Sequence, residues 1–301
     1  MPRHETTVGG SLGGLRLRWV LLAAALLVAV MAAAILAALH LRSRWSLPPP
    51  VPGDLTVALG DGVSMAFVEI APGTLDVPMH LGGLIPGYEL EIDEPYLVSA
   101  TEVSGAQWRA VMGSPPPLQP DPRKPVWVSF ADAQSFIARL QRFVGPRYEA
   151  YIPTEVQWEY ACRAGDPRDD LATRSPSSID AIAWHRDNSG MTQEPPPDLE
   201  GESSSATSWY GDPFHPVAGK APNAWGLYDM LGNAEEWCEP DVPADGGDVA
   251  DDAAAANRVV ARGGSGMTPR RNLSPRSVGS AARANPMFKA GVRVVLMRAI
   301  E

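Results

Sequence analysis

The segment at residues 232–236 has the residue types of an oxygen-rich cation site. Its sequence is GNAEE, in which Asn233 offers a side-chain carbonyl and Glu236 a carboxylate three residues later. Gly232 permits a tight loop whose backbone carbonyls turn inward, and Ca²⁺ takes roughly six to eight oxygen ligands of these kinds. We therefore hypothesise a Ca²⁺ site at this segment. The alternative is that Asn233 and Glu236 bond only to the backbone of their own loop.

Side chains suited to soft metals or to nucleophilic catalysis are few. Cys162 and Cys238 are the two cysteines, so at most one disulfide forms, and no CxxC pair supports a structural zinc or iron–sulfur centre. Neither has a nearby His or Lys in the sequence to lower the pKa of its thiol, so we predict no catalytic residue. A buried pair of free thiols and a single disulfide both stay open. The isolated histidines, His80, His185 and His215, favour a surface or internally bonded role over ligation.

Three short helices are predicted to position these side chains. Ser129 is an N-cap candidate for a helix that runs to residue 143 with apolar residues at helical spacing. Thr154 and Gln157 form the T-x-x-Q capping-box pattern of a second helix. A third begins near Ser104 and ends at Gly113, a residue type typical of helix C-termini.

The rest of the chain reads as short strands and irregular segments. The whole sequence holds 30 prolines and 28 glycines, which exclude a helix bundle and a regular doubly wound sheet. Two tracts low in large apolar residues, 191–211 and 241–256, are predicted surface loops. The predicted strands lie at residues 65–70, 96–100, 258–261 and 292–297.

Residues 19–41 are predicted to cross a membrane. They form an uncharged apolar run of 23 residues, long enough for a hydrocarbon core of about 30 Å and longer than the apolar part of a cleavable signal peptide. The order is then a cytoplasmic segment at 1–18, a signal anchor at 19–41, a proline-rich juxtamembrane linker at 42–61 and a globular domain at 62–298. The slight excess of arginine before the apolar run favours this orientation.

The part of the chain beyond residue 44 is acidic. It carries 20 basic and 34 acidic side chains, a net charge of −14. Nucleic acids and anionic bilayer surfaces attract basic patches, so this balance argues against both as partners of the globular domain. It is compatible with cation binding.

Seven segments follow one another in an order that resembles the sulfatase-modifying-factor family. That family includes the formylglycine-generating enzyme, the sulfoxide synthase of ergothioneine biosynthesis and the pyoverdine-maturation protein. The resemblance covers about residues 62–298 and implies an α+β, irregular fold related to C-type lectins, here preceded by one transmembrane helix. The segments are FVEIAPG, LVSATEVSGAQWRAVMG, PVWVSFADAQSFIARL, YIPTEVQWEYACRAG, HPVAGKAPNAWGLYDMLGNAEEWC, RVVARGGS and AGVRVV.

The resemblance also bears on metals. The family motif GNxxEW commonly forms part of a calcium site, and here it matches Gly232, Asn233, Glu236 and Trp237. Asn188 matches a residue of a second family calcium site more loosely, because an insertion follows it. The metal residues that the sequence predicts are therefore Asn233, Glu236 and Asn188, with Ca²⁺ as the ion.

The best-known chemistry of the family does not transfer. Formylglycine-generating enzymes hold Cu(I) between two cysteines that follow an RGGS motif, and soft Cu(I) requires such thiolates. Here RGGS stands at 262–265, and the matching positions are Thr268 and Leu273. We expect no copper. The sulfoxide synthases take iron-binding histidines from an additional helical domain, and we expect no such iron site here.

These observations lead to one functional hypothesis and two alternatives. We expect a membrane-anchored domain, periplasmic or extracellular, that acts as a binding or maturation module. The alternatives are an oxidoreductase resembling the pyoverdine-maturation branch and a structural partner in an envelope assembly. The expected partners are the lipid bilayer, through residues 19–41, and a protein or small-molecule ligand that the sequence does not name; nucleic acid is not among them.

Overall fold

The computed structural model describes residues 53–77, 87–118, 121–167, 176–193, 210–240, 258–282 and 289–299, together with Met31. The chain separates into two units, Met1–Ser46 and Leu47–Glu301, and the second contains the elements described below. The predicted membrane span at 19–41 lies outside the described residues except for Met31. Within the residues that are described, no helix is long and apolar enough to cross a membrane.

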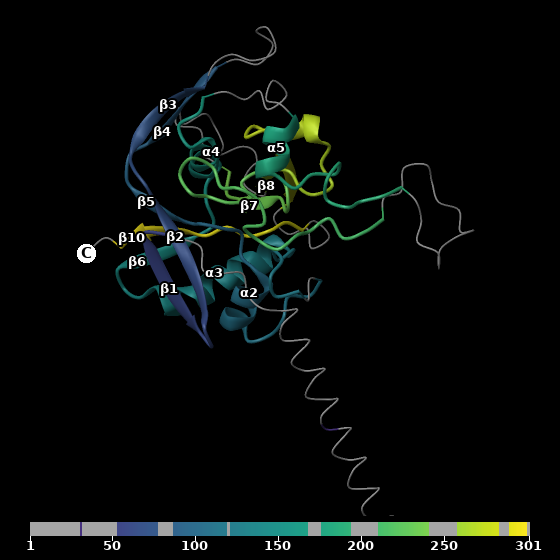
Figure 1. Cartoon of the computed structure of the whole chain (residues 1–301). Helices are drawn as coiled ribbons and strands as arrows, with labels where there is room; N and C mark the ends of the chain where they lie inside the picture. Colours follow the sequence, from purple (N-terminus) through teal and green to yellow (C-terminus); the bar gives the residue numbers. More distant parts are fainter. Residues whose placement is uncertain are drawn as a thin grey trace, which may run out of the picture. The chain divides into compact units, whose positions relative to one another are not determined.

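A five-stranded antiparallel sheet forms the centre of the second unit (Figure 1). The edge strand β1 alternates buried and exposed residues, whereas every residue of the central strand β5 is buried. Two other strands lie between β2 and β5 in the chain, yet β2 and β5 pair directly, and β10 lies between β5 and β6. In sheet order the strands are β1 (Leu55–Gly60), β2 (Val63–Ile70), β5 (Tyr96–Ser99), β10 (Val295–Arg298) and β6 (Tyr148–Tyr151).

Two apolar clusters cover the two faces of this sheet. Successive side chains of a strand point to opposite faces, and in β5 Leu97 belongs to one cluster and Val98 to the other. Helices α2 (Gly105–Met112) and α3 (Phe130–Val144) supply the first cluster, and α4 (Glu155–Arg163) supplies the second. Figure 1 shows α2 and α3 on one side of the sheet and α4 on the other.

The three predicted helices are confirmed, together with their caps. Ser104 and Thr154 each accept a hydrogen bond from the backbone of a glutamine three residues later, which completes a capping box before α2 and before α4. Ser129 caps α3 by accepting from the backbone N–H of Asp132. Gly113 ends α2 with a φ of 81°, a left-handed conformation that glycine adopts without strain.

Two smaller sheets complete the unit, which is a mixed α and β fold as predicted. The predicted strands at 65–70, 96–100 and 258–261 are confirmed, whereas the one predicted from residue 292 begins only at Val295. The two predicted surface loops fall mostly outside the described residues. The remaining elements are β3 (Gly73–Val77) paired with β4 (Tyr88–Ile92), the sheet of β7 (Glu236–Cys238), β8 (Arg258–Arg262) and β9 (Val278–Ala282), helix α5 (Pro176–Ile182) and the 3-10 turn η4 (Arg270–Asn272).

Candidate functional site

The GNAEEW segment forms a tight loop that leads into β7. Gly232 has a φ of 76°, and a Cβ atom there would lie 1.9 Å from the carbonyl oxygen of Trp184. Only glycine therefore fits this position. Asn233 follows with a φ of 54°, and its backbone N–H donates to the same Trp184 carbonyl at 2.9 Å. The loop is thus held against the segment that follows α5.

The side chain of Asn233 is fully buried and internally bonded. Its carbonyl oxygen Oδ1 accepts from the backbone N–H of His215 at 2.8 Å, and its Nδ2 donates to Oε2 of Glu102 at 2.9 Å. The other oxygen of Glu102 accepts from the backbone N–H of Ala234 at 2.9 Å. Asn233 therefore joins three separate segments of the chain.

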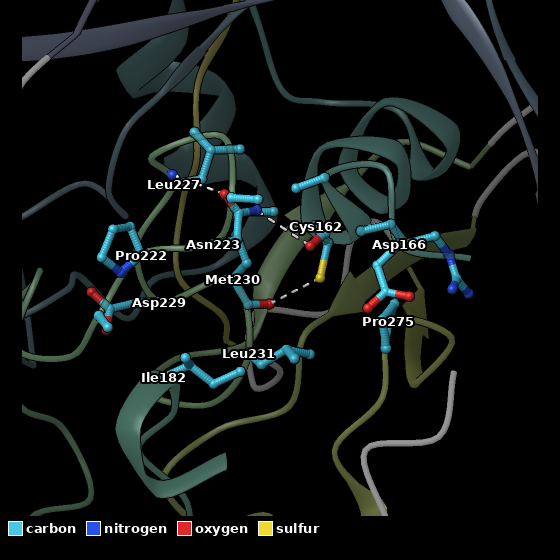
Figure 2. Close-up of a pocket in the computed structure, with 14 residues that line it drawn as sticks. Cys162, Asp166, Ile182, Pro222, Asn223, Leu227, Asp229, Met230, Leu231 and Pro275 are labelled. Atoms are coloured by element: carbon cyan, nitrogen blue, oxygen red, sulfur yellow. Dashed lines mark hydrogen bonds between the residues drawn. The ribbon is translucent and has the colours of Figure 1, made fainter. Parts of the chain in front are cut away.

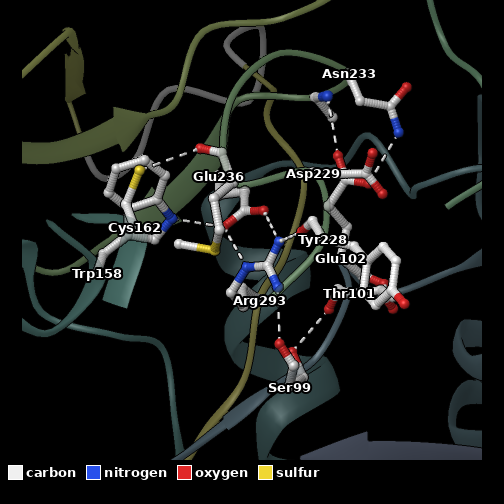
Figure 3. A network of polar contacts seen from close by, with 12 residues as sticks. Ser99, Thr101, Glu102, Trp158, Cys162, Tyr228, Asp229, Asn233, Glu236 and Arg293 are labelled. Carbon is white, nitrogen blue, oxygen red and sulfur yellow. Dashed lines mark hydrogen bonds and ion pairs between the residues drawn. The ribbon is translucent and has the colours of Figure 1, made fainter. Parts of the chain in front are cut away.

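Glu236 is the anion of a buried ion pair with Arg293 (Figure 3). Nε and Nη2 of Arg293 donate to its two carboxylate oxygens at 2.7 Å each, and Nε1 of Trp158 donates to the same carboxylate at 2.6 Å. The guanidinium also donates to the backbone carbonyls of Ser99 and Tyr228, at 2.7 and 2.8 Å. Burial alone would lower the pKa of Arg293, but the charge and hydrogen bonds of Glu236 raise it, so the arginine stays charged.

The predicted metal residues do not form an oxygen cage in this arrangement. Both carboxylate oxygens of Glu236 already accept from cationic or N–H donors, and a cation placed there would face the Arg293 guanidinium. Asn188 accepts from the backbone N–H of His185 at 2.8 Å and donates to the Ala183 carbonyl at 3.0 Å. No group of three or more His, Cys, Asp or Glu in the described ranges is placed to hold a metal ion. Ca²⁺ binding stays a prediction, and the Glu236 position does not fit it.

Two further buried acids lie beside this network, and the sequence pattern did not predict them. Glu102 is a lone acid directly after a buried strand, with no exposed surface, and Asp229 is 3% exposed in the segment before the loop. Burial, and then the charges of Asp229 and Glu236, raise the pKa of Glu102 well above its usual value. Burial likewise raises the pKa of Asp229 to about 6, against a hydrogen bond from Ala218 that lowers it. The sequence around Glu102, LVSATEVSG, mixes polar and apolar residues and gives no signal that this acid is buried.

The RGGS segment turns sharply and leaves a cavity beside it. Gly263 and Gly264 have φ values of 91° and 68°. Thr268 closes the turn, because its Oγ1 accepts from the backbone N–H of Ser265 and its own N–H donates to the Ser265 carbonyl, each at 2.9 Å. Leu273 is 2% exposed and belongs to the core.

The cavity has a volume of about 360 Å³, and polar and apolar groups contribute about equally to its lining. Burial raises the pKa of the Glu235 carboxyl group, which lies in its wall. Glu235 and Glu236 are neighbours in sequence but have different surroundings, since only Glu236 pairs with Arg293. The lining residues are Glu235, Ala261, Gly264, Thr268, Asn272, Ser277, Val278 and Gly279.

The arginine of RGGS has a structural role. Nη2 of Arg262 donates to Oε2 of Glu159 at 2.9 Å, and Nη1 donates to the Pro275 carbonyl at 3.0 Å. Glu159 also binds Arg163 within α4, at 2.6 Å. Arg262 therefore fixes the RGGS segment to α4 through a buried carboxylate.

A second cavity of about 360 Å³ lies at the end of α4, and Cys162 lines it (Figure 2). Cys162 and Cys238 are both buried thiols, not a disulfide, so the first of the two alternatives left open by the sequence is confirmed. The thiol of Cys162 contacts the Met230 carbonyl at 3.8 Å, and burial raises its pKa. A thiol held protonated in this way is a poor nucleophile.

The two described histidines are internally bonded, as the sequence predicted. His185 is 1% exposed, with its Nε2 2.7 Å from Oδ1 of Asp180. His215 stacks on Trp184 with ring centroids 3.7 Å apart. His80 lies outside the described residues.

Comparison with known proteins agrees with this architecture. A family model described as the sulfatase-modifying factor enzyme 1-like domain matches residues 66–298. The formylglycine-generating enzyme of Thermomonospora curvata is 30% identical over 188 residues, which cover 62% of this chain and 52% of the relative. The chain thus matches about half the length of that relative.

Two solved structures share the fold. Variable protein 1 of Treponema denticola superimposes with a TM-score of 0.60 at 22% identity, over 81% of this chain and 99% of that one. PvdO from Pseudomonas aeruginosa gives a TM-score of 0.55 at 18% identity, over 82% and 99%. At these identities the likeness concerns the fold alone. The family match over most of the chain, with RGGS and GNAEEW in the places described above, shows that this protein belongs to the sulfatase-modifying factor enzyme 1-like family.

Proposed function

We propose that this chain is a binding or maturation module of its family, anchored in a membrane with its globular domain outside the cytoplasm, and that it is not a copper oxidase. The observation that carries the proposal is the pair of side chains at the positions where the family's copper enzymes have cysteines. Thr268 closes a backbone turn, and Leu273 lies in the core. Neither offers a thiolate.

Copper does not fit the residues present around RGGS. Cu(I) takes two soft sulfur ligands, and a threonine hydroxyl is a hard oxygen that already accepts a hydrogen bond from Ser265. Cys162 and Cys238 are the two cysteines of the sequence, and each is buried elsewhere in the core. Cys162 lines the cavity at the end of α4, which shares no lining residue with the RGGS cavity.

The RGGS cavity supports a binding role in place of oxidation. Its volume falls within the range of about 300–1,000 Å³ that small-molecule and peptide side-chain pockets occupy. Glu235 offers a carboxylate in its wall, and Thr268, Asn272 and Ser277 add hydroxyl and amide groups. Such a cavity suits a ligand that donates hydrogen bonds.

The proposed location rests on composition. An uncharged run of 23 residues precedes a proline-rich linker, and the remainder of the chain is acidic. An acidic globular domain does not adsorb to anionic lipid, so the apolar run would be its attachment to the bilayer.

Activity on a sulfatase-type peptide tests the proposal. The full chain in detergent, supplied with Cu(I) and a reductant, is incubated with a CxPxR peptide, and formylglycine is measured by mass spectrometry. We expect no product above the rate without enzyme, while a formylglycine-generating enzyme converts the same peptide under the same conditions. Turnover by this chain would refute the proposal. A redox metal that copurifies with the chain in stoichiometric amount would favour the oxidoreductase alternative.

A further inference from the structure

The cavity at the end of α4 is a candidate site independent of RGGS. Its walls come from the last turn of α4, from Ile182 at the end of α5 and from the loops on either side of Leu227. At about 360 Å³ it falls within the range of small-molecule pockets. Figure 2 shows Asp229 and Asp166 on opposite sides of it, with apolar side chains between them.

Most of the polar groups in this wall are already bonded. Nδ2 of Asn223 donates to the Ala161 carbonyl at 2.8 Å, and its Oδ1 accepts from the backbone N–H groups of Trp225 and Leu227 at 3.0 and 3.1 Å. The Cys162 thiol contacts the Met230 carbonyl. These groups shape the cavity but are not available to a ligand.

Asp229 is different, because one of its carboxylate oxygens has no partner. Oδ2 accepts from the backbone N–H of Ala218 at 2.6 Å. Oδ1 is buried and accepts no hydrogen bond from any described residue. Leaving a buried acceptor unpaired is costly, so such a group in a native fold calls for an explanation. Asp229 lines the cavity, and a bound donor would supply the missing bond.

The charges around Asp229 indicate which donor. Glu102, Asp229 and Glu236 are all buried, and Arg293 is the cation that pairs with Glu236. Glu102 accepts its hydrogen bonds from neutral groups. The ammonium of Lys220 donates to the Asp180 carbonyl and lies 3.8 Å from the centre of the Trp184 ring. Arg163, which also lines the cavity, is paired with Glu159, and neither Arg293 nor Lys220 donates to Oδ1 of Asp229. A cationic donor at Oδ1 would therefore balance the charge of this carboxylate better than a neutral one.

We propose that this cavity binds a small amphipathic amine, whose ammonium group donates to Oδ1 of Asp229 and whose apolar body lies against Ile182, Leu227 and Leu231. The ammonium would sit at the buried end of the cavity. The apolar body would fill the space that these side chains enclose, where burial of carbon surface adds to the affinity. This site requires neither copper nor the RGGS segment.

Calorimetric titration of the full chain with 2-phenylethylamine tests the proposal, with 2-phenylethanol as the neutral ligand of the same shape. We expect the amine to bind saturably with a Kd of about 1 mM or less and the alcohol to bind at least about tenfold more weakly. Asp229→Asn should weaken amine binding by about tenfold or more. Asp166→Asn, on the opposite wall, is the matched control and should change it by less than about twofold.

Three results would overturn the proposal: no saturable binding of the amine, equal binding of the alcohol, or loss of amine binding in Asp166→Asn but not in Asp229→Asn. Circular dichroism checks that each variant folds. Should Asp229→Asn fail to fold, Ala224→Phe replaces it, because Ala224 lies on the exposed rim of the cavity. The phenyl group should block the cavity and abolish amine binding at an unchanged melting temperature, and retained binding would contradict the assignment.

Discussion

Replacing Glu236 by glutamine is the sharpest test of the buried network, because it removes one charge and keeps the shape. Arg293 is fully buried and holds Glu236 through two hydrogen bonds of 2.7 Å. Removing one partner of a buried ion pair costs about 3–5 kcal/mol, since the other charge is left uncompensated. For a domain of this size each kcal/mol shifts the melting temperature by about 2–4 °C, so we expect a fall of roughly 6–20 °C.

Urea denaturation and thermal melting of the full chain measure this change, in calcium and in chelator. Glu235→Gln is the matched control: this neighbour forms no ion pair with any described residue, and the change should cost about 0.5 kcal/mol or less. In the double variant Glu236→Gln, Arg293→Met neither charge remains, so it should be more stable than the sum of the two single changes predicts.

The result that would refute this reasoning is a loss below about 1 kcal/mol for Glu236→Gln. A calcium-dependent rise in the melting temperature of the wild type that vanishes in Glu236→Gln would point to another arrangement. It would favour the Ca²⁺ site predicted from the GNxxEW motif over the ion pair with Arg293.

Three further predictions concern stability and topology. Burial raises the pKa of Asp229 to about 6, so between about pH 4 and 6 the folded chain keeps a proton on Asp229 that the unfolded chain has lost. The free energy of unfolding therefore falls as pH rises through this range, by on the order of 3 kcal/mol. Asp229→Asn should reduce this slope in urea titrations, while the raised pKa values of Glu102 and Glu235 keep part of it, and an unchanged slope would contradict the assignment. Gly232→Ala should prevent folding, since its Cβ would clash with Trp184, whereas Gly226→Ala, with an equally positive φ but open space, should cost about 1–2 kcal/mol by circular dichroism. A reporter fused after Glu301 should be active only outside the cytoplasm, and cytoplasmic activity would reverse the proposed orientation.

The sequence was most informative where structure is local. The caps of α2, α3 and α4 depend on residues three positions apart, and all three helices begin where Ser104, Ser129 and Thr154 place them. The sequence pattern did not predict strands with small or charged residues, such as β3 and β4. The charged residues of β4 (YELEI) weaken its strand signal, and its pairing with β3 is what defines it.

The site was only partly predictable, because its contacts join residues far apart in the chain. The sequence identified Asn233 and Glu236 as special but not their partners, which are Glu102 and Arg293. A glutamate that binds a metal ion and a glutamate that pairs with an arginine look alike in sequence. The direction of the side chain, set by the strand it begins, decides between them.

The position of β10 has a consequence for how the protein is made. This strand lies between β5 and β6, yet it follows all four other strands of its sheet in the chain. During synthesis the sheet therefore stays divided until β10 emerges, and Arg293, just before β10, arrives equally late to neutralise Glu236. Pairing strands so distant in sequence is slow, and the open edges of β5 and β6 are exposed to aggregation in the meantime. A nascent chain stalled before residue 293 would thus expose both of these edges to chaperones and proteases, and the central sheet closes only once β10 has been made.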